Sequence, residues 1–327
     1  MTLSSTSGHA APANAATRRL GRTDIEIAPL VLGGNVFGWT ADEATSVALL
    51  DAFVAEGFTA IDTADVYSRW VPGNDSESEK IIGRWLKARG NRDKVHIFTK
   101  VGSDVGQGKI DLSAKWIEQA VEASLTRLQT DYIDLYQSHW PDPTVSQEET
   151  LEAYGKLIAA GKVRYIGASN YDAALLVEAL TLSADKGLPR YESLQNEYNL
   201  HKREAFEGAV QELLLREGIG AITYYGLAAG FLTGKYRTEA DLTGARGNSV
   251  RRYLDERGLR ILAAQDKVAA ETGATHAEIA LAWIIAQPGI TAPLSSATST
   301  AQLAGLIRGA RLTLAAEHLA ALTAAGA

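Results

Sequence analysis

The sequence of 327 residues contains no cysteine. Disulfides, thiolate nucleophiles and cysteine-ligated metals are therefore excluded. No apolar run approaches the ~18 residues of a membrane-spanning helix, so we expect no membrane segment. The histidines other than His139 are His9, His96, His201, His276 and His318, and they show no metal-ligand spacing. We accordingly expect no metal site.

Long blocks of like charge are also absent, and the net charge at pH 7 is −7. A chain of this kind is not expected to bind nucleic acid or an anionic membrane surface. The composition is 46% apolar and 22% charged, which is ordinary for a globular protein with a sizeable core.

The first 17 residues are small and polar, and Arg18 and Arg19 follow them. A secretory signal would place the positive charge first and an apolar segment after it. We therefore interpret residues 1–17 as a disordered leader and expect a cytoplasmic protein.

Eight short apolar runs rich in β-branched residues alternate with longer segments of helical periodicity, such as residues 42–57 and 113–128. The runs are residues 29–34, 58–64, 95–101, 132–140, 163–170, 191–198, 219–226 and 290–296. Eight strands that are each followed by a helix predict a parallel sheet closed into a (β/α)8 TIM barrel.

Two segments do not fit the strand–helix alternation. Residues 18–29 have the pattern of a small β-hairpin before the first strand, and residues 235–258 are charged and too long for a simple loop. We interpret the second segment as an insertion after strand 7. Since no linker-like change of composition divides the chain, residues 18–327 are predicted to form one barrel domain.

Active sites of such barrels lie at the carboxyl ends of the strands. The stretch AIDTADVYSRW, residues 60–70, ends a strand in Asp62 and places Tyr67 just beyond it. Lys100 and His139 end the next two strands. Each residue alone has a simpler reading, as a cap, a loop aromatic or a solvated strand end. Together they are predicted to converge at one mouth of the barrel.

This set of residues suits proton transfer to a carbonyl oxygen. A tyrosine has an ordinary pKa of ~10, too high for ready proton delivery at neutral pH. A neighbouring ammonium favours the phenolate and lowers that pKa, and a carboxylate can hold the ammonium in place. We therefore expect Asp62 to position Lys100, Lys100 to tune Tyr67, and a neutral His139 to orient the carbonyl.

Six motifs in this order resemble those of the aldo-keto reductase superfamily. They are DTADVY, FTK, QSHW, GASN, LQNEYN and YYGLAAGFLTGKY. The resemblance runs from about Arg18 to about residue 315. It implies the (β/α)8 fold, NADPH-dependent carbonyl reduction and a catalytic tetrad that falls on Asp62, Tyr67, Lys100 and His139.

The resemblance also implies a set of residues that bind the cofactor. Ser169, Asn170 and Gln195 match residues that hold the nicotinamide carboxamide, and Tyr224 matches the aromatic that stacks on the ring. The other expected contacts are Gly34, Asn35, Asp62, Gly226, Leu227, Ala228, Gly230, Thr233, Lys235, Ser296, Thr298 and Gln302. The family often reads YSPLAxG after strand 7, whereas this chain has YYGLAAG, so the path of that loop is left open.

The loop after the last strand decides which nicotinamide cofactor is expected. In the family it commonly reads PxPGARxxxQLxxN, and its basic residue grips the 2′-phosphate. This chain has Ser296 in place of the glycine and Thr298 in place of the basic residue, and no cation lies between Pro293 and Arg308. Hydroxyl groups and helix amides remain as donors. The resemblance therefore still favours NADP(H), and NAD(H) stays possible.

The substrate is predicted to be a small carbonyl or alcohol compound. Trp39, Trp70 and Trp140 fall on loops at the same mouth, where they either line the substrate pocket with Tyr67 and His139 or pack over the barrel rim. No feature predicts a particular oligomeric state.

Two other functions stay open: a Schiff-base enzyme using Lys100, and a non-catalytic partner like the channel-associated β subunits that share the resemblance.

Overall fold

The computed structural model describes residues 16–242 and 247–327. The predicted leader, residues 1–17, lies outside this range except for Ala16 and Thr17, and its disorder stays a prediction. Part of the predicted insertion, residues 243–246, is also outside the described residues.

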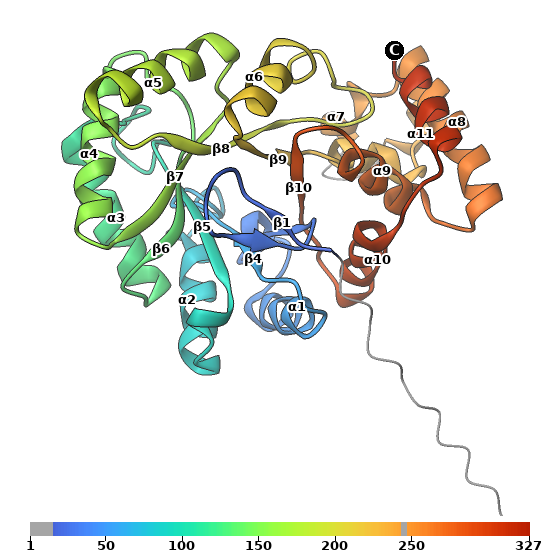
Figure 1. Cartoon of the computed structure of the whole chain (residues 1–327). Helices are drawn as coiled ribbons and strands as arrows, with labels where there is room; N and C mark the ends of the chain where they lie inside the picture. Colours follow the sequence, from blue (N-terminus) through green and yellow to red (C-terminus); the bar gives the residue numbers. More distant parts are fainter. Residues whose placement is uncertain (1–15, 243–246) are drawn as a thin grey trace, which may run out of the picture.

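Eight parallel strands form a closed barrel, as predicted (Figure 1). They are β3 (Val31–Gly33), β4 (Ala60–Asp62), β5 (His96–Val101), β6 (Ile133–Ser138), β7 (Val163–Ser169), β8 (Tyr191–Glu197), β9 (Gly220–Tyr224) and β10 (Ile290–Ser295). The barrel closes where Leu294 of β10 pairs with Val31 of β3. Because all strands run in one direction, their carboxyl ends surround a single opening.

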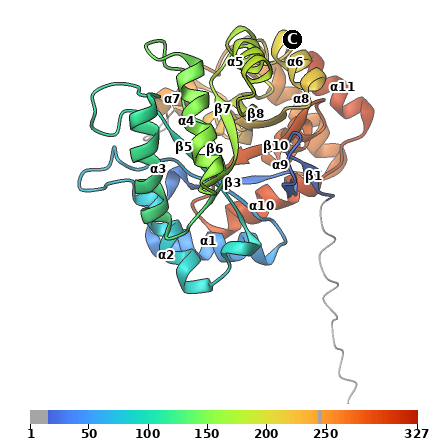
Figure 2. The same cartoon turned by 60° about the vertical axis from the view of Figure 1, so that its left-hand side comes forward.

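Helices surround the barrel, and Figure 2 shows α3, α4 and α5 outside β6, β7 and β8. The ring consists of α1 (Glu43–Ala55), α2 (Glu77–Arg89), α3 (Ala114–Leu128), α4 (Gln147–Ala159), α5 (Ala173–Lys186), α6 (Ala209–Glu217), α9 (His276–Ile285) and α10 (Thr300–Arg311). Local signals explain many of the helix ends. Ser113 and Asp172 accept hydrogen bonds from the first turns of α3 and α5, and Gly187 ends α5 in the left-handed conformation.

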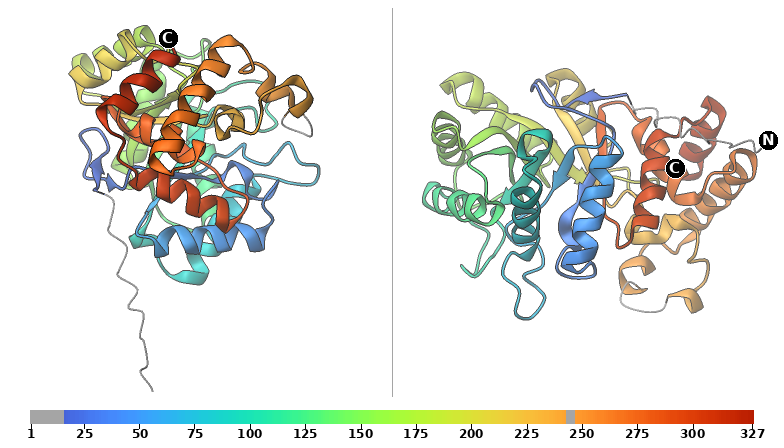
Figure 3. Two further views of the ribbon diagram at one scale, coloured as in Figure 1. Left: turned by 90° about the vertical axis from the view of Figure 1, so that its right-hand side faces the viewer. Right: turned by 90° about the horizontal axis from the view of Figure 1, so that it is seen from below.

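The predicted insertion after strand 7 is confirmed, and it is longer than expected. Between β9 and α9 lie η3 (Ala228–Thr233), η4 (Glu239–Asp241), α7 (Gly247–Arg251) and α8 (Glu256–Thr272). Helix α8 packs against the C-terminal helix α11 (Ala316–Ala325), beside the barrel (Figure 3). The insertion therefore continues beyond residue 258 into a full helix.

The predicted hairpin consists of β1 (Arg18–Arg19) and β2 (Glu26–Ile27), which lie in front of the barrel strands in Figure 1. Its apolar side chains close the amino-terminal end of the barrel. The hairpin residues Leu20, Ile25 and Ile27 form one buried cluster with inward-facing residues of the barrel strands. The strand residues are Val31, Ala60, Phe98, Leu135, Ile222 and Ala292. Since this end is sealed with apolar groups, polar chemistry is left to the opposite end.

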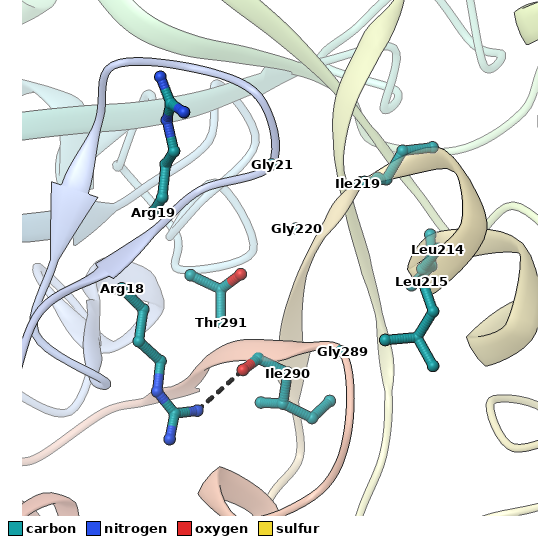
Figure 4. Close-up of a pocket in the computed structure, with 11 residues that line it drawn as sticks. Arg18, Arg19, Gly21, Leu214, Leu215, Ile219, Gly220, Gly289, Ile290 and Thr291 are labelled. Carbon is teal, nitrogen blue, oxygen red and sulfur yellow. Dashed lines mark hydrogen bonds between the residues drawn. The ribbon is translucent and has the colours of Figure 1, made fainter.

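A shallow pocket of about 270 Å³ lies where the hairpin meets β9 and β10 (Figure 4). Its two arginines already bind the backbone. Arg18 donates to the carbonyl oxygens of Ile285 and Ile290 at 2.8 and 2.9 Å, and Arg19 donates to that of Thr23. The guanidinium groups therefore hold the hairpin in place, and no acid–base pair lines this pocket.

Gly220→Ala is expected to lower the free energy of unfolding by about 1–3 kcal/mol, the usual cost of overpacking. A Cβ atom at this position would lie 2.7 Å from both the Gly21 nitrogen and Leu20 Cδ1 of the hairpin. Urea denaturation measures the effect. Gly155→Ala in α4 is the matched control, because its Cβ would lie 3.4 Å from the nearest atom of Pro189. The control should be neutral or stabilising, since alanine is the better helix former. Equal stabilities of the two variants would contradict the tight contact between hairpin and barrel.

Candidate active site

The four residues predicted to act together come from neighbouring strand ends. Asp62 is the last residue of β4, Lys100 lies near the end of β5, and His139 directly follows β6. Tyr67 lies in the loop after β4. Because β4, β5 and β6 pair side by side in parallel, their carboxyl ends bring these side chains to one side of the opening.

The ammonium group of Lys100 is fully buried and uses all three of its donors. It donates to Asp62 Oδ1 at 2.5 Å, to Tyr67 Oη at 2.9 Å and to the backbone oxygen of Thr63 at 2.9 Å. Burial alone would lower the pKa of Lys100, but the charge of Asp62, the interaction with Tyr67 and the hydrogen bonds to both together outweigh burial, so the pKa lies above its ordinary value. Lys100 is therefore a fixed cation between the carboxylate and the phenol.

The second carboxylate oxygen of Asp62 accepts hydrogen bonds from two glutamines. Gln195 Nε2 lies 3.0 Å away and Gln137 Nε2 lies 3.2 Å away. A buried carboxylate needs such partners, because a charge without them is costly. Sequence reasoning did not identify Gln137. The signal was present: Gln137 and inward-facing Leu135 are two residues apart on β6, so both face the barrel interior.

Tyr67 is more basic than the sequence suggested. Burial raises the pKa of Tyr67 above its ordinary value, and the ammonium of Lys100 opposes this shift without reversing it. The expectation of a lowered pKa considered the cation but not the loss of water around the phenolate, which weighs more. Tyr67 is therefore a protonated phenol at neutral pH, with its oxygen held by Lys100.

His139 is half-buried with its ring between two aromatic side chains. It stacks on Trp140, with centroids 5.8 Å apart and planes 9° apart, and it meets the edge of Tyr67 at 5.9 Å. Burial and the nearby Lys100 hold the pKa of His139 well below its ordinary range. The ring is therefore neutral at physiological pH. Its Nδ1 atom lies 3.0 Å from the hydroxyl of Ser103, a residue that sequence reasoning did not identify.

The residues expected to hold the nicotinamide carboxamide form a chain of hydrogen bonds. Ser169 donates to the Gln195 backbone oxygen at 2.8 Å, and Tyr224 donates to Asn170 Oδ1 at 2.6 Å. Asn170 Nδ2 donates to the backbone oxygen of His139 at 2.9 Å. These residues therefore lie together at the ends of β7, β8 and β9, next to the histidine.

The loop after β9 has an unusual backbone. Tyr225, Ala228, Ala229 and Gly230 all have positive φ angles, between 49° and 101°. Gly226 and Ala228 are buried, Leu227 is half-buried, and the Thr233 hydroxyl donates to the Gly230 backbone oxygen at 2.7 Å. Lys235 is exposed and has no acidic partner among the described residues. Successive turns of this kind present backbone amides that bind anions.

The ends of β3 and β10 lie side by side at the opening, between those of β4 and β9. Ser296 donates to Asn35 Oδ1, and Gly34 is buried, with its backbone oxygen accepting from Ser78 at 2.7 Å. At the start of α10 the amide and hydroxyl of Thr298 donate to Gln302 Oε1 at 2.9 and 3.1 Å. This loop therefore presents neutral hydroxyl and amide groups next to a helix N-terminus.

Three tryptophans project from loops near the tetrad. Trp39, Trp70 and Trp140 are 47%, 49% and 41% exposed, high for so large an apolar residue. Trp39 and Trp70 meet edge to face at 5.5 Å, and Trp70 lies 6.3 Å from Tyr67. An open aromatic surface therefore adjoins the phenol and the imidazole.

In the described residues no group of three or more histidine, aspartate or glutamate side chains is arranged to hold a metal ion. Nor does that part of the chain contain a helix long and apolar enough to cross a membrane.

Comparison with known proteins gives consistent matches. A model of the aldo/keto reductase family matches residues 29–327. Protein tas of Escherichia coli (strain K12) is 35% identical over 94% of this chain and 96% of its own length. Aldo-keto reductase YhdN of Bacillus subtilis (strain 168) is 36% identical over 84% of this chain and 81% of its own length. A probable voltage-gated potassium channel subunit beta of Oryza sativa subsp. japonica is 32% identical over 88% of each. The chain thus belongs to the aldo/keto reductase family, whose members are oxidoreductases that act on carbonyl compounds.

Proposed function

We propose that this protein reduces an aldehyde or ketone to an alcohol with NADPH, reversibly, and that Tyr67 is the general acid and base. The observation that carries the proposal is the buried Lys100 ammonium, which donates to both Asp62 and the Tyr67 hydroxyl. A proton donor at the open end of the barrel is thus hydrogen-bonded to a fixed cation.

The roles of the side chains follow from this geometry. In reduction, Tyr67 gives its proton to the carbonyl oxygen as negative charge develops there. Lys100 stabilises the phenolate that remains, and Asp62 keeps the ammonium in position. His139 is neutral and half-buried beside Tyr67, so it is suited to donate a hydrogen bond that orients the carbonyl oxygen.

The donor groups around the opening fit a nicotinamide dinucleotide, which would supply the hydride. Amide and hydroxyl groups of Ser169, Asn170 and Gln195 lie beside the tetrad and suit a carboxamide. The turns of the β9 loop and the exposed Lys235 suit a pyrophosphate. Ser296 and Thr298 at the start of α10 suit the adenosine end.

The preference for NADPH over NADH is expected to be modest. A 2′-phosphate is held best by a bidentate arginine, and residues 293–307 contain none. Hydroxyl groups of Ser296, Thr298 and Ser299 and the amides of α10 can supply neutral hydrogen bonds instead. A few such bonds contribute roughly 1–3 kcal/mol, which corresponds to at most about two decades in affinity.

Thr298→Arg is expected to lower the Kd for NADPH by about tenfold and to leave the Kd for NADH nearly unchanged. The new guanidinium adds a charge-assisted contact that only the 2′-phosphate can use. The amide of residue 298 can still donate to Gln302, so the loop should keep its shape. Fluorescence titration with each cofactor measures both constants.

Thr313→Arg is the matched control, because it adds the same charge at an exposed position beyond the end of α10. It should change neither constant. An equal effect of Thr298→Arg on both cofactors would place the 2′-phosphate elsewhere, as would tighter binding of NADH than of NADPH by the unchanged protein.

A panel of aldehydes and ketones, assayed with NADPH and with NADH, tests the proposed function directly. Consumption of the reduced cofactor with at least one carbonyl compound is the expected result. Aromatic carbonyl compounds should be included because Trp39, Trp70 and Trp140 adjoin the tetrad. Absence of turnover across a broad panel would count against an enzyme and favour a partner role like that named for the rice relative.

Schiff-base chemistry at Lys100 is disfavoured by the geometry. The amine must be deprotonated and accessible to attack a carbonyl carbon. Lys100 has instead a raised pKa, no solvent exposure and three hydrogen bonds. Borohydride in the presence of a carbonyl substrate should therefore trap no covalent adduct. The cytoplasmic location expected from the sequence stays a prediction.

A further inference from the structure

We propose that Ser103 is a positioning residue that fixes both the tautomer and the ring orientation of His139. This inference rests on the proposed function in one respect: it explains how His139 presents an N–H group to a carbonyl oxygen. Ser103 lies three residues beyond Lys100 in the loop after β5. It is buried, with only 7% of its surface exposed.

The two residues share one hydrogen bond, and its direction is set by the tautomer of His139. Ser103 Oγ lies 3.0 Å from His139 Nδ1, and Nδ1 is its only hydrogen-bond partner within residues 16–242 and 247–327. In the proposed arrangement the hydroxyl hydrogen points to Nδ1, which accepts it, so that Nε2 can donate to a ligand. A neutral imidazole that accepts at Nδ1 carries its own hydrogen on Nε2.

The other contacts given for His139 do not distinguish the two orientations of its ring that are related by a half-turn. Its backbone is held by Val101 and Asn170, and its ring packs against Trp140 and Tyr67. A half-turn of the ring would keep these packing contacts while exchanging each nitrogen with a carbon atom. It would also break the bond to Ser103. The bond to Ser103 is therefore the one hydrogen bond of the ring, within the described part of the chain, that selects the orientation.

The surroundings of Nε2 agree with a His139 tautomer that carries its hydrogen on this atom. Nε2 of His139 has no hydrogen-bond partner in the part of the chain that the structure describes, and it is not among the buried polar atoms left unpaired there. With Nδ1 bound to Ser103, Nε2–H is the nitrogen left to meet a ligand at the barrel mouth.

The loop after β5 holds Ser103 in place. Gln107 Nε2 donates to the Ser103 backbone oxygen at 2.8 Å, and Gln107 Oε1 accepts from the Val105 amide at 2.8 Å. Gly102 has φ +106°, and a Cβ atom there would lie 2.6 Å from Leu112 Cδ2. Glycine is therefore required at position 102, and the loop that follows it is braced by its own hydrogen bonds.

Nitrogen-15 NMR of the uniformly labelled protein tests the inference without an assay of turnover. His139→Asn assigns the His139 signals by their loss. In the unchanged protein, Nε2 should carry the hydrogen and Nδ1 should show the shift of a hydrogen-bonded acceptor. In Ser103→Ala the Nδ1 resonance should move to an unbonded position, and kcat/KM for carbonyl reduction should fall by a factor on the order of 10. Ser103→Thr keeps the hydroxyl and should restore both properties.

Ser183→Ala is the matched control, because Ser183 in α5 is also 7% exposed and its hydroxyl bonds the backbone oxygens of Ala179, in the same helix, and Pro189, just after the helix end. It should leave the His139 signals and kcat/KM unchanged. A hydrogen on Nδ1 in the unchanged protein would overturn the inference, as would an unmoved Nδ1 resonance in Ser103→Ala. If the resonance moves but His139→Asn retains full turnover, the Ser103 contact is supported and the proposed role of His139 is wrong.

Discussion

Tyr67→Phe is expected to lower kcat for carbonyl reduction by a factor on the order of 10² or more, the usual cost of losing a general acid. The variant keeps the ring and removes only the proton donor. Lys100 loses one of its three acceptors but keeps Asp62 and the backbone oxygen of Thr63, so the site should stay assembled. Steady-state kinetics measures the loss, and fluorescence quenching by the cofactor should be retained.

Tyr132→Phe provides the matched control, since Tyr132 directly precedes β6 at the opposite end of the barrel and its hydroxyl has no partner among the described residues. Its kcat should match that of the unchanged protein. Near-normal turnover by Tyr67→Phe would show that another group delivers the proton.

Lys100→Met is expected to lower the free energy of unfolding by about 3–5 kcal/mol, because it leaves the carboxylate of Asp62 buried without its cation. It should also move the pH profile of alcohol oxidation to higher pH. Oxidation needs the phenolate as base, and removal of the ammonium removes the interaction that opposes the raised pKa of Tyr67. Urea denaturation and the pH dependence of kcat measure the two effects.

The double variant Asp62→Asn/Lys100→Met separates these effects. An asparagine oxygen can still accept from Gln137 and Gln195, and no buried charge remains, so much of the lost stability should return. The pH profile should stay shifted because the cation is still absent. If Lys100→Met lowers the rate without moving the profile, Lys100 positions groups and does not tune Tyr67.

The barrel was predictable because the sequence patterns that indicate its strands and helices are local. Each strand is a short apolar run, and helix ends carry their own caps, such as Ser113 and Gly187. The alternation of these patterns indicates a parallel barrel, whose strands all end at one mouth. The same rule predicts from the sequence that Asp62, Lys100 and His139 lie near one another. Helix α8 extended the insertion further than predicted, because its pattern does not show whether it joins the ring or packs outside it.

Hydrogen-bond partners and pKa values depended on segments far apart in the chain. Gln137 and Gln195 reach Asp62 across the barrel interior, and Ser103 meets His139 from a neighbouring strand end. No spacing in the sequence specifies these pairs, since they result from the register between strands. The raised pKa of Tyr67 has the same origin: the cation was visible in the sequence, but the burial that outweighs it is produced only by the assembled structure. The sequence by itself determined the barrel and the position of Asp62, Lys100 and His139 at neighbouring strand ends. The tertiary structure decided which other side chains meet them and how all of them are bonded, because strand register and burial exist only after the barrel has closed.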